Sequence, residues 1–489
     1  MLDASADGDP FFPRDEDLAL KVEIPGWGTQ EDIFNIIPLE HDDLLDSDDD
    51  SEDIQKNARQ SNRVKQVHMM GTKPELKAFN RRECTYEIFA YEVWPKVTKK
   101  SEIDCHPSLV WTEIMSFIKG SYESLQTEKG FLDKTEYIGI GRKRAPNFSG
   151  NRSQVYDIFL RYHHYKQQYS LFDEADLLYK LYCRLRTMAF QPWIFHEIYV
   201  DETQDFTQAE LALLVSLCSD PNKMFLTGDT AQSIMRGISF RFNDLRSLFF
   251  YVKKSAKKSE RNLSVIEIPQ KVHQLTHNYR SHTGILSLAS SVLDILLELF
   301  PDSFDPLEKD QGMFAGPKPI IIETSSSEDL ALLLTGSRRK TSHIEFGAHQ
   351  AVLVVNEKAK EQLPKELGCG IVLTIFESKG LEFDDILIYN FFKDSHAKKE
   401  WRVVTDFLRK LAQTEVTNGN LNSLVEIDAD VLAQSSKTRP LEFDPNQHKV
   451  LNSELKHLYT AITRARVNVW IFDEDNEKRM PMFEYFKAR

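Results

Sequence analysis

Two acidic residues follow directly after a short apolar run in the middle of the chain. The apolar residues 198–200 precede Asp201 and Glu202 in the stretch IYVDETQDFT. An apolar run that turns acidic is typical of a buried strand whose C-terminal end carries a functional site. There, Asp201 could hold Mg²⁺, and Glu202 could orient and deprotonate an attacking water molecule. The alternative is an acidic strand end that caps the next helix through Asp205 or Thr207.

Two later segments also place polar side chains just after apolar residues. In FLTGDTAQSI (225–234), Gln232 offers an amide that could sense a γ-phosphate, although a turn is the simpler explanation when this segment is taken alone. In NYRSHTGIL (278–286), the Tyr279 ring could stack on a purine. The planar guanidinium of Arg280 could donate two parallel hydrogen bonds to a phosphate. Both segments therefore offer groups that suit a nucleotide.

The C-terminal third of the chain contains two more segments of this kind. In FESKGLEFDD (376–385), Gly380 permits a close backbone approach, and Glu382 could accept a hydrogen bond from a ribose hydroxyl. The segment LYTAITRARVNVWIF (458–472) is expected to be a helix that leads into a strand, with Arg464 at the junction. A single arginine on a helix is more often part of a solvated face, so this segment alone decides little.

Short apolar runs beside these polar groups predict the strands that position them. The expected strands cover residues 196–202, 223–229, 272–278, 318–324, 349–356, 370–376, 384–392 and 468–474. Runs rich in Val, Ile and Leu that alternate with helical stretches such as TQAELALLVSLC predict buried parallel strands with crossover helices. The runs are too many for one compact sheet, so we expect an α/β protein with two domains that meet near residue 275.

The rest of the chain is expected to form a leader, a helical unit and two insertions. Residues 1–71 are expected to be an acidic, largely disordered leader, because the first 70 residues contain 18 acidic and 6 basic side chains. Residues 72–189 carry apolar side chains at helical spacing and predict a helical unit. The basic stretch 253–261 and the polar stretch 394–447 are expected to be surface insertions.

Composition narrows the class of protein. The 489 residues are 41% hydrophobic, and no apolar run approaches the ~18 residues that a membrane span needs. The N-terminus does not resemble a signal peptide, and the five cysteines are scattered without a CxxC pair. We therefore expect an intracellular protein, nuclear or cytoplasmic, without a membrane partner, a zinc site or a disulfide framework.

The order of the polar segments resembles the motif series of superfamily 1 helicases of the UvrD/Rep type. DETQD, GDTAQS, NYRS, SKGLEF and YTAITRAR follow one another in the family's order, over about residues 170–475. The resemblance implies two RecA-like parallel-sheet domains of the P-loop NTPase type, an incomplete first one over 190–275 and a second one over 276–480. It also implies that the helical unit is a 1B-like subdomain. In this family ATP and Mg²⁺ bind between the two domains, and hydrolysis moves single-stranded nucleic acid.

The resemblance assigns roles in catalysis and metal binding to five residues. Asp201 would be the Mg²⁺ ligand, and Glu202 would activate the attacking water. Gln232 would sense the γ-phosphate, and Arg280 would contact it. Arg464 would act as an arginine finger from the second domain.

Three further residues would bind the nucleotide, but the contacts to nucleic acid look weaker than in the family. Tyr279 would stack on adenine, and Gly380 and Glu382 would lie at the nucleotide. Residues 235–237, Met-Arg-Gly, stand where the family usually has aromatic residues, and Phe376 stands in place of a histidine. Because base stacking contributes about 1–3 kcal/mol per base, these changes would weaken the grip on a strand.

One motif of the family is missing from the sequence. The phosphate-binding loop ends in Gly-Lys followed by Ser or Thr, and this chain contains no Gly-Lys dipeptide. We expect that the loop lies upstream in a longer protein, which would make this chain part of an ATP-dependent helicase acting on single-stranded DNA or RNA. The alternative is a degenerate helicase fold that serves as a regulatory or scaffold module without efficient ATP turnover. Its protein partners would bind through the acidic leader or the helical unit.

Overall fold

The computed structural model describes most of the chain that follows residue 81. The described residues are 82–99, 105–144, 148, 150–187, 195–258, 266–306, 308–324, 330, 349–365, 367, 370–418, 439–445 and 447–489. The chain divides into two units, residues 1–76 and 77–489, and every described residue belongs to the second unit. The expected leader, residues 1–71, lies outside the described residues. We refer to 82–187 as the helical unit, to 195–258 as the small-sheet region and to 266–489 as the large-sheet region.

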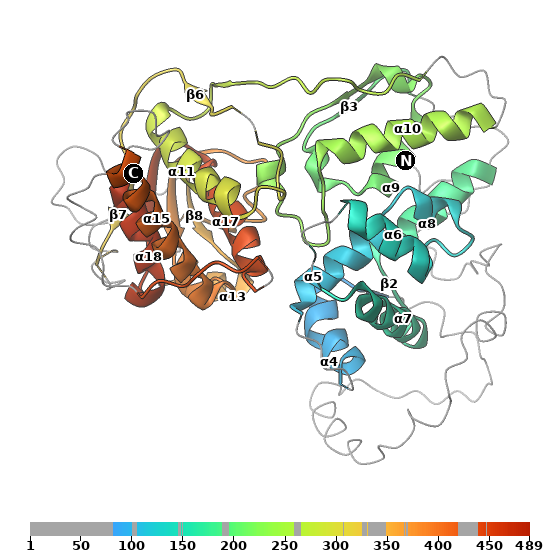
Figure 1. The fold of residues 1–489 in the computed structure, drawn as a ribbon, viewed down its shortest axis with the longest axis horizontal. Helices are drawn as coiled ribbons and strands as arrows, with labels where there is room; N and C mark the ends of the chain where they lie inside the picture. The colour runs from blue at the N-terminus through green and yellow to red at the C-terminus, as the bar shows by residue number, and fades with distance from the viewer. Residues whose placement is uncertain are drawn as a thin grey trace, which may run out of the picture. The chain divides into compact units, whose positions relative to one another are not determined.

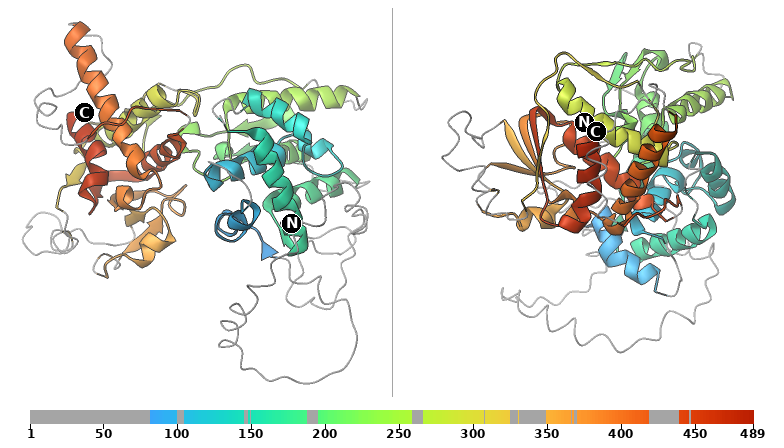
Figure 2. Two further views of the ribbon diagram at one scale, coloured as in Figure 1. Left: turned by 60° about the horizontal axis from the view of Figure 1, so that its bottom comes forward. Right: turned by 60° about the vertical axis from the view of Figure 1, so that its left-hand side comes forward.

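The large-sheet region is built on five parallel strands (Figures 1 and 2). Their order across the sheet is β7 (Ile320–Ile322), β11 (Ala465–Phe472), β10 (Phe383–Tyr389), β8 (Gln350–Val354) and β9 (Ile371–Thr374). Central strand β10 pairs Ile386 with Val469 of β11 and with Ala351 of β8. The prediction of buried parallel strands in this part of the chain is confirmed.

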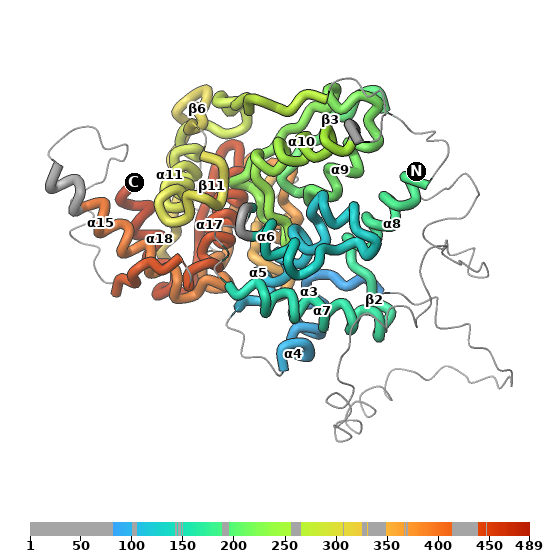
Figure 3. The backbone as a smooth tube through the Cα atoms, turned by 45° about the vertical axis from the view of Figure 1, so that its right-hand side comes forward, coloured from blue at the N-terminus to red at the C-terminus, as the bar shows by residue number. Residues whose placement is uncertain are grey.

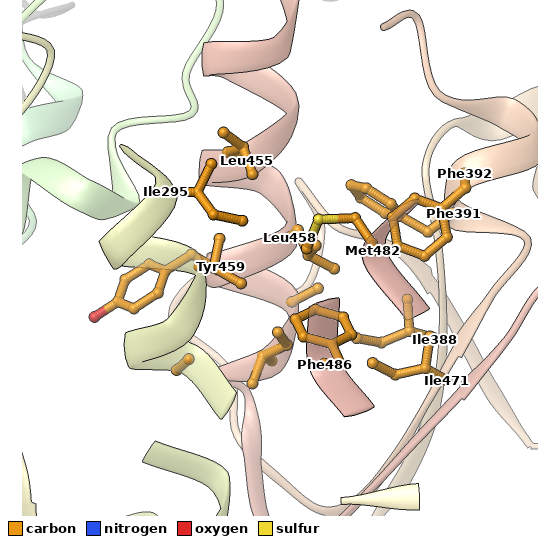
Figure 4. Close-up of a cluster of buried hydrophobic side chains, with 14 of the residues drawn as sticks. Ile295, Ile388, Phe391, Phe392, Leu455, Leu458, Tyr459, Ile471, Met482 and Phe486 are labelled. Atoms are coloured by element: carbon orange, nitrogen blue, oxygen red, sulfur yellow. The ribbon is translucent and has the colours of Figure 1, made fainter. Parts of the chain in front are cut away.

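Both faces of this sheet are covered, as the unbroken apolar runs predict. Along β10, Ile386 and Ile388 belong to one hydrophobic cluster, whereas Leu387 and Tyr389 belong to the cluster on the opposite face. This alternation follows from the two-residue repeat of a strand. The first cluster is filled by helices α11 (Thr283–Leu299), α17 (Lys449–Ile462) and α18 (Asn476–Ala488). Figure 4 shows Leu455 beside Ile295 and Leu458 beside Met482.

We expected the interval 394–447 to be a polar surface insertion, but its described residues contribute to the core, and 419–438 lie outside them. The turn η8 (Lys398–Trp401) leads into α15 (Arg402–Asn418). Trp401, Val404 and Phe407 are buried in the same cluster as α17 and α18. Apolar residues three or four positions apart give α15 one buried face, although its overall composition is polar.

The small-sheet region contains two parallel strands with helices beside them. Strands β3 (Ile198–Val200) and β4 (Met224–Leu226) lie within the first two predicted strands, and α9 (Gln208–Leu217) and α10 (Phe242–Lys258) pack against each other. A capping box between Thr207 and Glu210 begins α9, so Thr207 does cap the helix that follows the acidic strand end. The expected insertion at 253–261 begins as the last turns of α10.

Short strands β5 (His277–Asn278) and β6 (Gln311–Gly312) pair within the large-sheet region. Only β5 forms within the predicted strand 272–278.

Most elements of the helical unit are helices, and Figure 3 traces their backbone in colours from blue to green. The unit is built around aromatic side chains and contains a buried group of charges. Its elements are β1 (Arg82–Glu83), α3 (Tyr86–Ile88), η2 (Phe89–Val93), α4 (Trp94–Val97), α5 (Pro107–Thr112), η3 (Glu113–Ile118), η4 (Glu123–Gln126), α6 (Lys134–Arg144), α7 (Arg152–Gln168), β2 (Leu171–Phe172) and α8 (Glu174–Thr187). Phe89 lies 4.8 Å from Trp111 and 5.4 Å from Tyr162, measured between ring centroids. No helix in the described part of the chain combines the length and the hydrophobicity that a membrane crossing requires.

Candidate active site

The acidic pair lies at the C-terminal end of β3, as the sequence predicts. The carboxylate of Asp201 accepts a hydrogen bond from the Thr227 hydroxyl at 2.5 Å and another from the Glu202 backbone N–H at 2.9 Å. Glu202 has φ 52°, in the left-handed region that non-glycine residues rarely adopt. The Gln204 side-chain amide donates to the Glu202 carboxylate. Backbone strain of this kind is concentrated at functional sites, and here it is held by local hydrogen bonds.

The turn after β4 is tied to the acidic pair through side-chain amides. The backbone N–H of Asp229 donates to Gln204 Oε1 at 3.0 Å. The Asp229 carboxylate accepts from the Ala231 N–H at 2.9 Å and from Gln232 Nε2 at 3.0 Å. Burial raises the pKa of Asp229. The Gln232 amide therefore has a fixed orientation, with its nitrogen on Asp229 and its oxygen on Arg464 Nη2 at 2.5 Å.

Arg464 lies at the junction between α17 and β11 and is 1% exposed. Its guanidinium also donates to the carbonyl oxygens of Thr460 at 3.1 Å and Leu381 at 3.4 Å. Burial, and then the charge of Arg280, lower the pKa of Arg464, whereas the Glu202 carboxylate acts in the opposite direction. Glu202 and Arg280 are thus both near enough to Arg464 to shift its pKa.

Arg280 is held by one of the residues expected at the nucleotide. Its Nε donates to Glu382 Oε2 at 2.7 Å, and the two side chains are 37% and 44% exposed. The backbone N–H of Arg280 donates to the side-chain oxygen of Asn278 at 2.9 Å. Arg466 lies 3.6 Å from Glu382 and 3.6 Å from Asp384, so Glu382 has two cationic neighbours.

Tyr279 and Gly380 are at the surface. Tyr279 is 83% exposed, and Gly380 has φ +76° with open space where a Cβ atom would lie. Within the described residues, no hydrogen bond links the side chain of Tyr279 to the other predicted site residues. The structure thus links Glu202 to Gln232 through hydrogen bonds of Gln204 and Asp229, and it bonds Gln232 directly to Arg464. It also brings Arg280 and Glu382 together as a neighbouring pair.

The structure adds residues that sequence reasoning missed. Lys379 donates to the Asp205 carboxylate and, at 3.0 Å, to the carbonyl oxygen of Gln232. The Tyr459 hydroxyl donates to the Asp229 carboxylate at 3.4 Å. Each of these residues stands inside or beside a motif segment, which is the one signal that could have pointed to it. Their pairing joins positions up to 230 residues apart, which spacing along the chain does not reveal.

The carboxylates of the candidate site suit a metal ion that a bound ligand would help to coordinate. Among the residues that the structure describes, no three His, Cys, Asp or Glu side chains are grouped so as to hold a metal ion. Mg²⁺ commonly binds through one or two carboxylates and completes its octahedron with substrate phosphates and water. Asp201, an exposed carboxylate oriented by Thr227, fits that role.

Comparison with known proteins supports a helicase-like chain. Residues 35–248 match the family described as the UvrD/REP helicase N-terminal domain, a match that begins inside the segment expected to be a leader. Residues 35–248 are therefore similar to the N-terminal domain of UvrD/Rep helicases. Over all 489 residues it is 49% identical to human TPR and ankyrin repeat-containing protein 1, and it spans 16% of that protein's length. It is 29% identical over 220 residues, 42% of this chain, to the Probable DNA helicase II homolog of Mycoplasma pneumoniae, and it spans 28% of that protein.

Proposed function

We propose that this chain is a superfamily 1 helicase region that binds ATP and Mg²⁺ between its small-sheet and large-sheet regions and couples hydrolysis to movement on single-stranded nucleic acid. One observation carries the proposal. A connected series of hydrogen bonds runs from Glu202 through Gln204, Asp229 and Gln232 to Arg464. It joins the acidic strand end to the arginine that the second sheet supplies, which is the arrangement that phosphoryl transfer requires.

The roles of the individual side chains follow from their positions and charges. Asp201 would hold Mg²⁺, which supplies positive charge to the phosphates when the nucleotide is bound. Glu202 would accept a proton from the attacking water. Arg464 and Arg280 would stabilise the negative charge that develops on the transferred phosphoryl group. Gln232, fixed by Asp229, would report the state of the phosphates to Arg464.

The contacts made by the two arginines favour exchange with a phosphate. Arg280 is paired with Glu382 at the surface, where an ion pair contributes only about 0–1 kcal/mol. Arg464 donates to the neutral oxygens of Gln232, Thr460 and Leu381. A guanidinium gains more from a phosphate than from a neutral acceptor, because charge-assisted bidentate bonds are the stronger ones. Glu382, released from Arg280, would then accept a hydrogen bond from a ribose hydroxyl. Tyr279 and Gly380 would leave room for the base and the phosphates.

The test is ATP hydrolysis by the full-length protein, with and without single-stranded DNA or RNA. Glu202→Gln should lower strand-stimulated turnover by about 10²–10⁴-fold, because it removes the general base and keeps the shape. Glu197→Gln, which changes a carboxylate near the start of the same strand, is the matched control and should leave turnover unchanged. If no DNA or RNA stimulates hydrolysis, the motor function is wrong. Nucleotide binding without turnover would instead favour the regulatory module, in line with the missing Gly-Lys dipeptide.

A further inference from the structure

Helix α17 contacts the turn that carries Gln232 through two side chains that have no role in the proposed chemistry. That turn is η7 (Thr230–Gln232), and Asp229 caps its start through the Ala231 N–H. Lys456 and Tyr459 are three residues apart, so they project from the same side of α17. In Figure 4, the hydroxyl of Tyr459 points away from Leu455 and Leu458, which face the hydrophobic cluster.

Lys456 fixes the backbone at the first residue of the turn. Its buried ammonium donates to the carbonyl oxygen of Thr230 at 3.3 Å and to that of Ser303 at 2.7 Å. The hydroxyl of Thr230 accepts from the Asp305 N–H at 2.8 Å. Both acceptors of Lys456 are backbone carbonyls, so these bonds set the position of η7 relative to α17.

Tyr459 acts on the carboxylate that orients the sensing amide. Its hydroxyl reaches Asp229 Oδ2 at 3.4 Å, the same oxygen that accepts from Gln232 Nε2 at 3.0 Å. Because that bond fixes the amide nitrogen of Gln232, the amide oxygen is left to accept from Arg464. Arg464 itself follows the last residue of α17 by two positions.

We propose that Lys456 and Tyr459 are positioning residues for the hydrolysis step, and this proposal rests on the proposed function. They hold η7 in one register against α17, and that register sets the contact between Gln232 and Arg464. A shift of α17 along the turn would break the bonds of Lys456, Tyr459 and Arg464 together. Docking of one helix would thereby decide whether the sensing amide and the arginine finger are engaged.

The first experiment needs no nucleotide. In the full chain, amide hydrogen exchange at Ala231, Gln232 and Ser233 should become about tenfold faster in Tyr459→Phe, because the variant loses one hydrogen bond that holds the turn. Lys456→Met should show at least the same increase, and Lys456→Arg should restore slow exchange. Tyr485→Phe is the matched control: it removes a buried hydroxyl that donates to Ser291 in α11, and it should leave exchange in η7 unchanged. Native exchange rates at η7 in Tyr459→Phe would overturn the proposal.

The second experiment separates positioning from a general loss of structure. If the full-length protein hydrolyses ATP, Tyr459→Phe should lower kcat by about tenfold with KM for ATP within about twofold, because the displaced groups act on the transition state. A rise in KM at native kcat would overturn the positioning role. If the full-length protein shows no turnover, the proposed function fails, and the exchange experiment still decides whether Lys456 and Tyr459 hold the turn.

Discussion

The helical unit and the candidate active site each contain a cluster of charged side chains, and the two clusters are built differently. In the helical unit, Lys119 and Lys166 each bond to both Asp173 and Asp176, which we call the charge quartet. Its side chains are 0–3% exposed except for Asp176, at 18%. Burial by itself would raise the pKa of Asp173, but the two ammonium groups outweigh it and lower the pKa. The two ammonium groups and the two carboxylates neutralise one another, so the quartet has no net charge.

The two arginines of the candidate active site lack a buried anionic partner among the described residues, unlike Lys379, which pairs with Asp205. Arg464 is as buried as the quartet, yet it donates to neutral oxygens, such as that of Gln232. Arg280 has an anionic partner, Glu382, but the pair is partly exposed. Removing one member of a buried, mutually paired cluster destabilises the fold, whereas charges without such partners are available to another molecule. From this difference we expect the quartet to serve structure and the two arginines of the candidate site to serve binding.

The largest expected effect comes from breaking the quartet. Asp173→Asn should lower the free energy of unfolding by about 3–5 kcal/mol, because it leaves the Lys119 and Lys166 ammonium groups with one carboxylate between them. Asp173 also accepts from the Tyr162 hydroxyl at 2.8 Å, so a third partner is affected. Denaturant unfolding of the full chain measures the change.

The control for this prediction is an exposed ion pair in the same unit. Asp157 on α7 lies 2.7 Å from Lys134, and both side chains are at least 40% exposed. Asp157→Asn should change the free energy of unfolding by about 0–1 kcal/mol. Similar losses in the two variants would contradict the view that mutual pairing and burial give the quartet its structural role.

Sequence patterns predicted the large sheet because its strands are buried on both faces. Residues such as Ile386 and Leu387 face opposite clusters, so the strand appears as an unbroken apolar run. The same reasoning missed α15, because its apolar residues, such as Val404 and Phe407, are separated by polar ones. A helix needs only one apolar face to pack against a core. The quartet was missed as well, since its lysines and aspartates come from segments that look amphipathic.

The positions of three candidate site residues after strands could be predicted from the sequence, but the contacts between site residues could not. Asp201, Glu202 and Gln232 follow strands, and a strand end restricts where a side chain can lie. The contact between Lys379 and Asp205 joins positions 174 residues apart, and nothing in either segment indicates the other. Likewise, Glu382 was expected at a ribose, and its hydrogen bond to Arg280 joins positions 102 residues apart, which the sequence does not reveal.

A second prediction concerns a buried carboxylate that lacks the cations of the quartet. Burial raises the pKa of Glu454 from 4.5 to about 7, although Ser395, Arg236 and His396 act in the opposite direction. Between pH 4.5 and 7 the folded state keeps a proton that the unfolded state releases, so stability falls as pH rises. The loss should reach up to about 3 kcal/mol by pH 8, and Glu454→Gln should remove it.

Denaturant unfolding at pH 5 and at pH 8 measures this dependence. The variant should gain stability relative to the native chain as pH rises. By contrast, the quartet loses stability only in strong acid, because the pKa of Asp173 and that of Asp176 are lowered. If the difference between native chain and variant stays constant with pH, Glu454 is not protonated in the folded state.

A third prediction tests the exposed ring of the candidate site. Tyr279→Ala should leave the free energy of unfolding unchanged, because the side chain is 83% exposed. If Tyr279 stacks on adenine, the variant should lose about 0.5–1.5 kcal/mol of ATP affinity, measured by calorimetry on the full chain. Tyr199→Ala, at a 73% exposed tyrosine on β3, is the matched control and should keep native affinity. Equal losses in both variants would count against a specific contact at Tyr279.

The smallest expected effect comes from the ion pair that holds Arg280. Glu382→Gln should lower the free energy of unfolding by about 0–1 kcal/mol, since an exposed pair gains little over solvation. The difference should vanish in 1 M NaCl, where screening acts over about 3 Å. The loss in Asp173→Asn should persist there, because buried charges are screened much less. A salt-resistant loss of several kcal/mol in Glu382→Gln would place Glu382 with the structural charges and leave Arg280 unavailable to a phosphate.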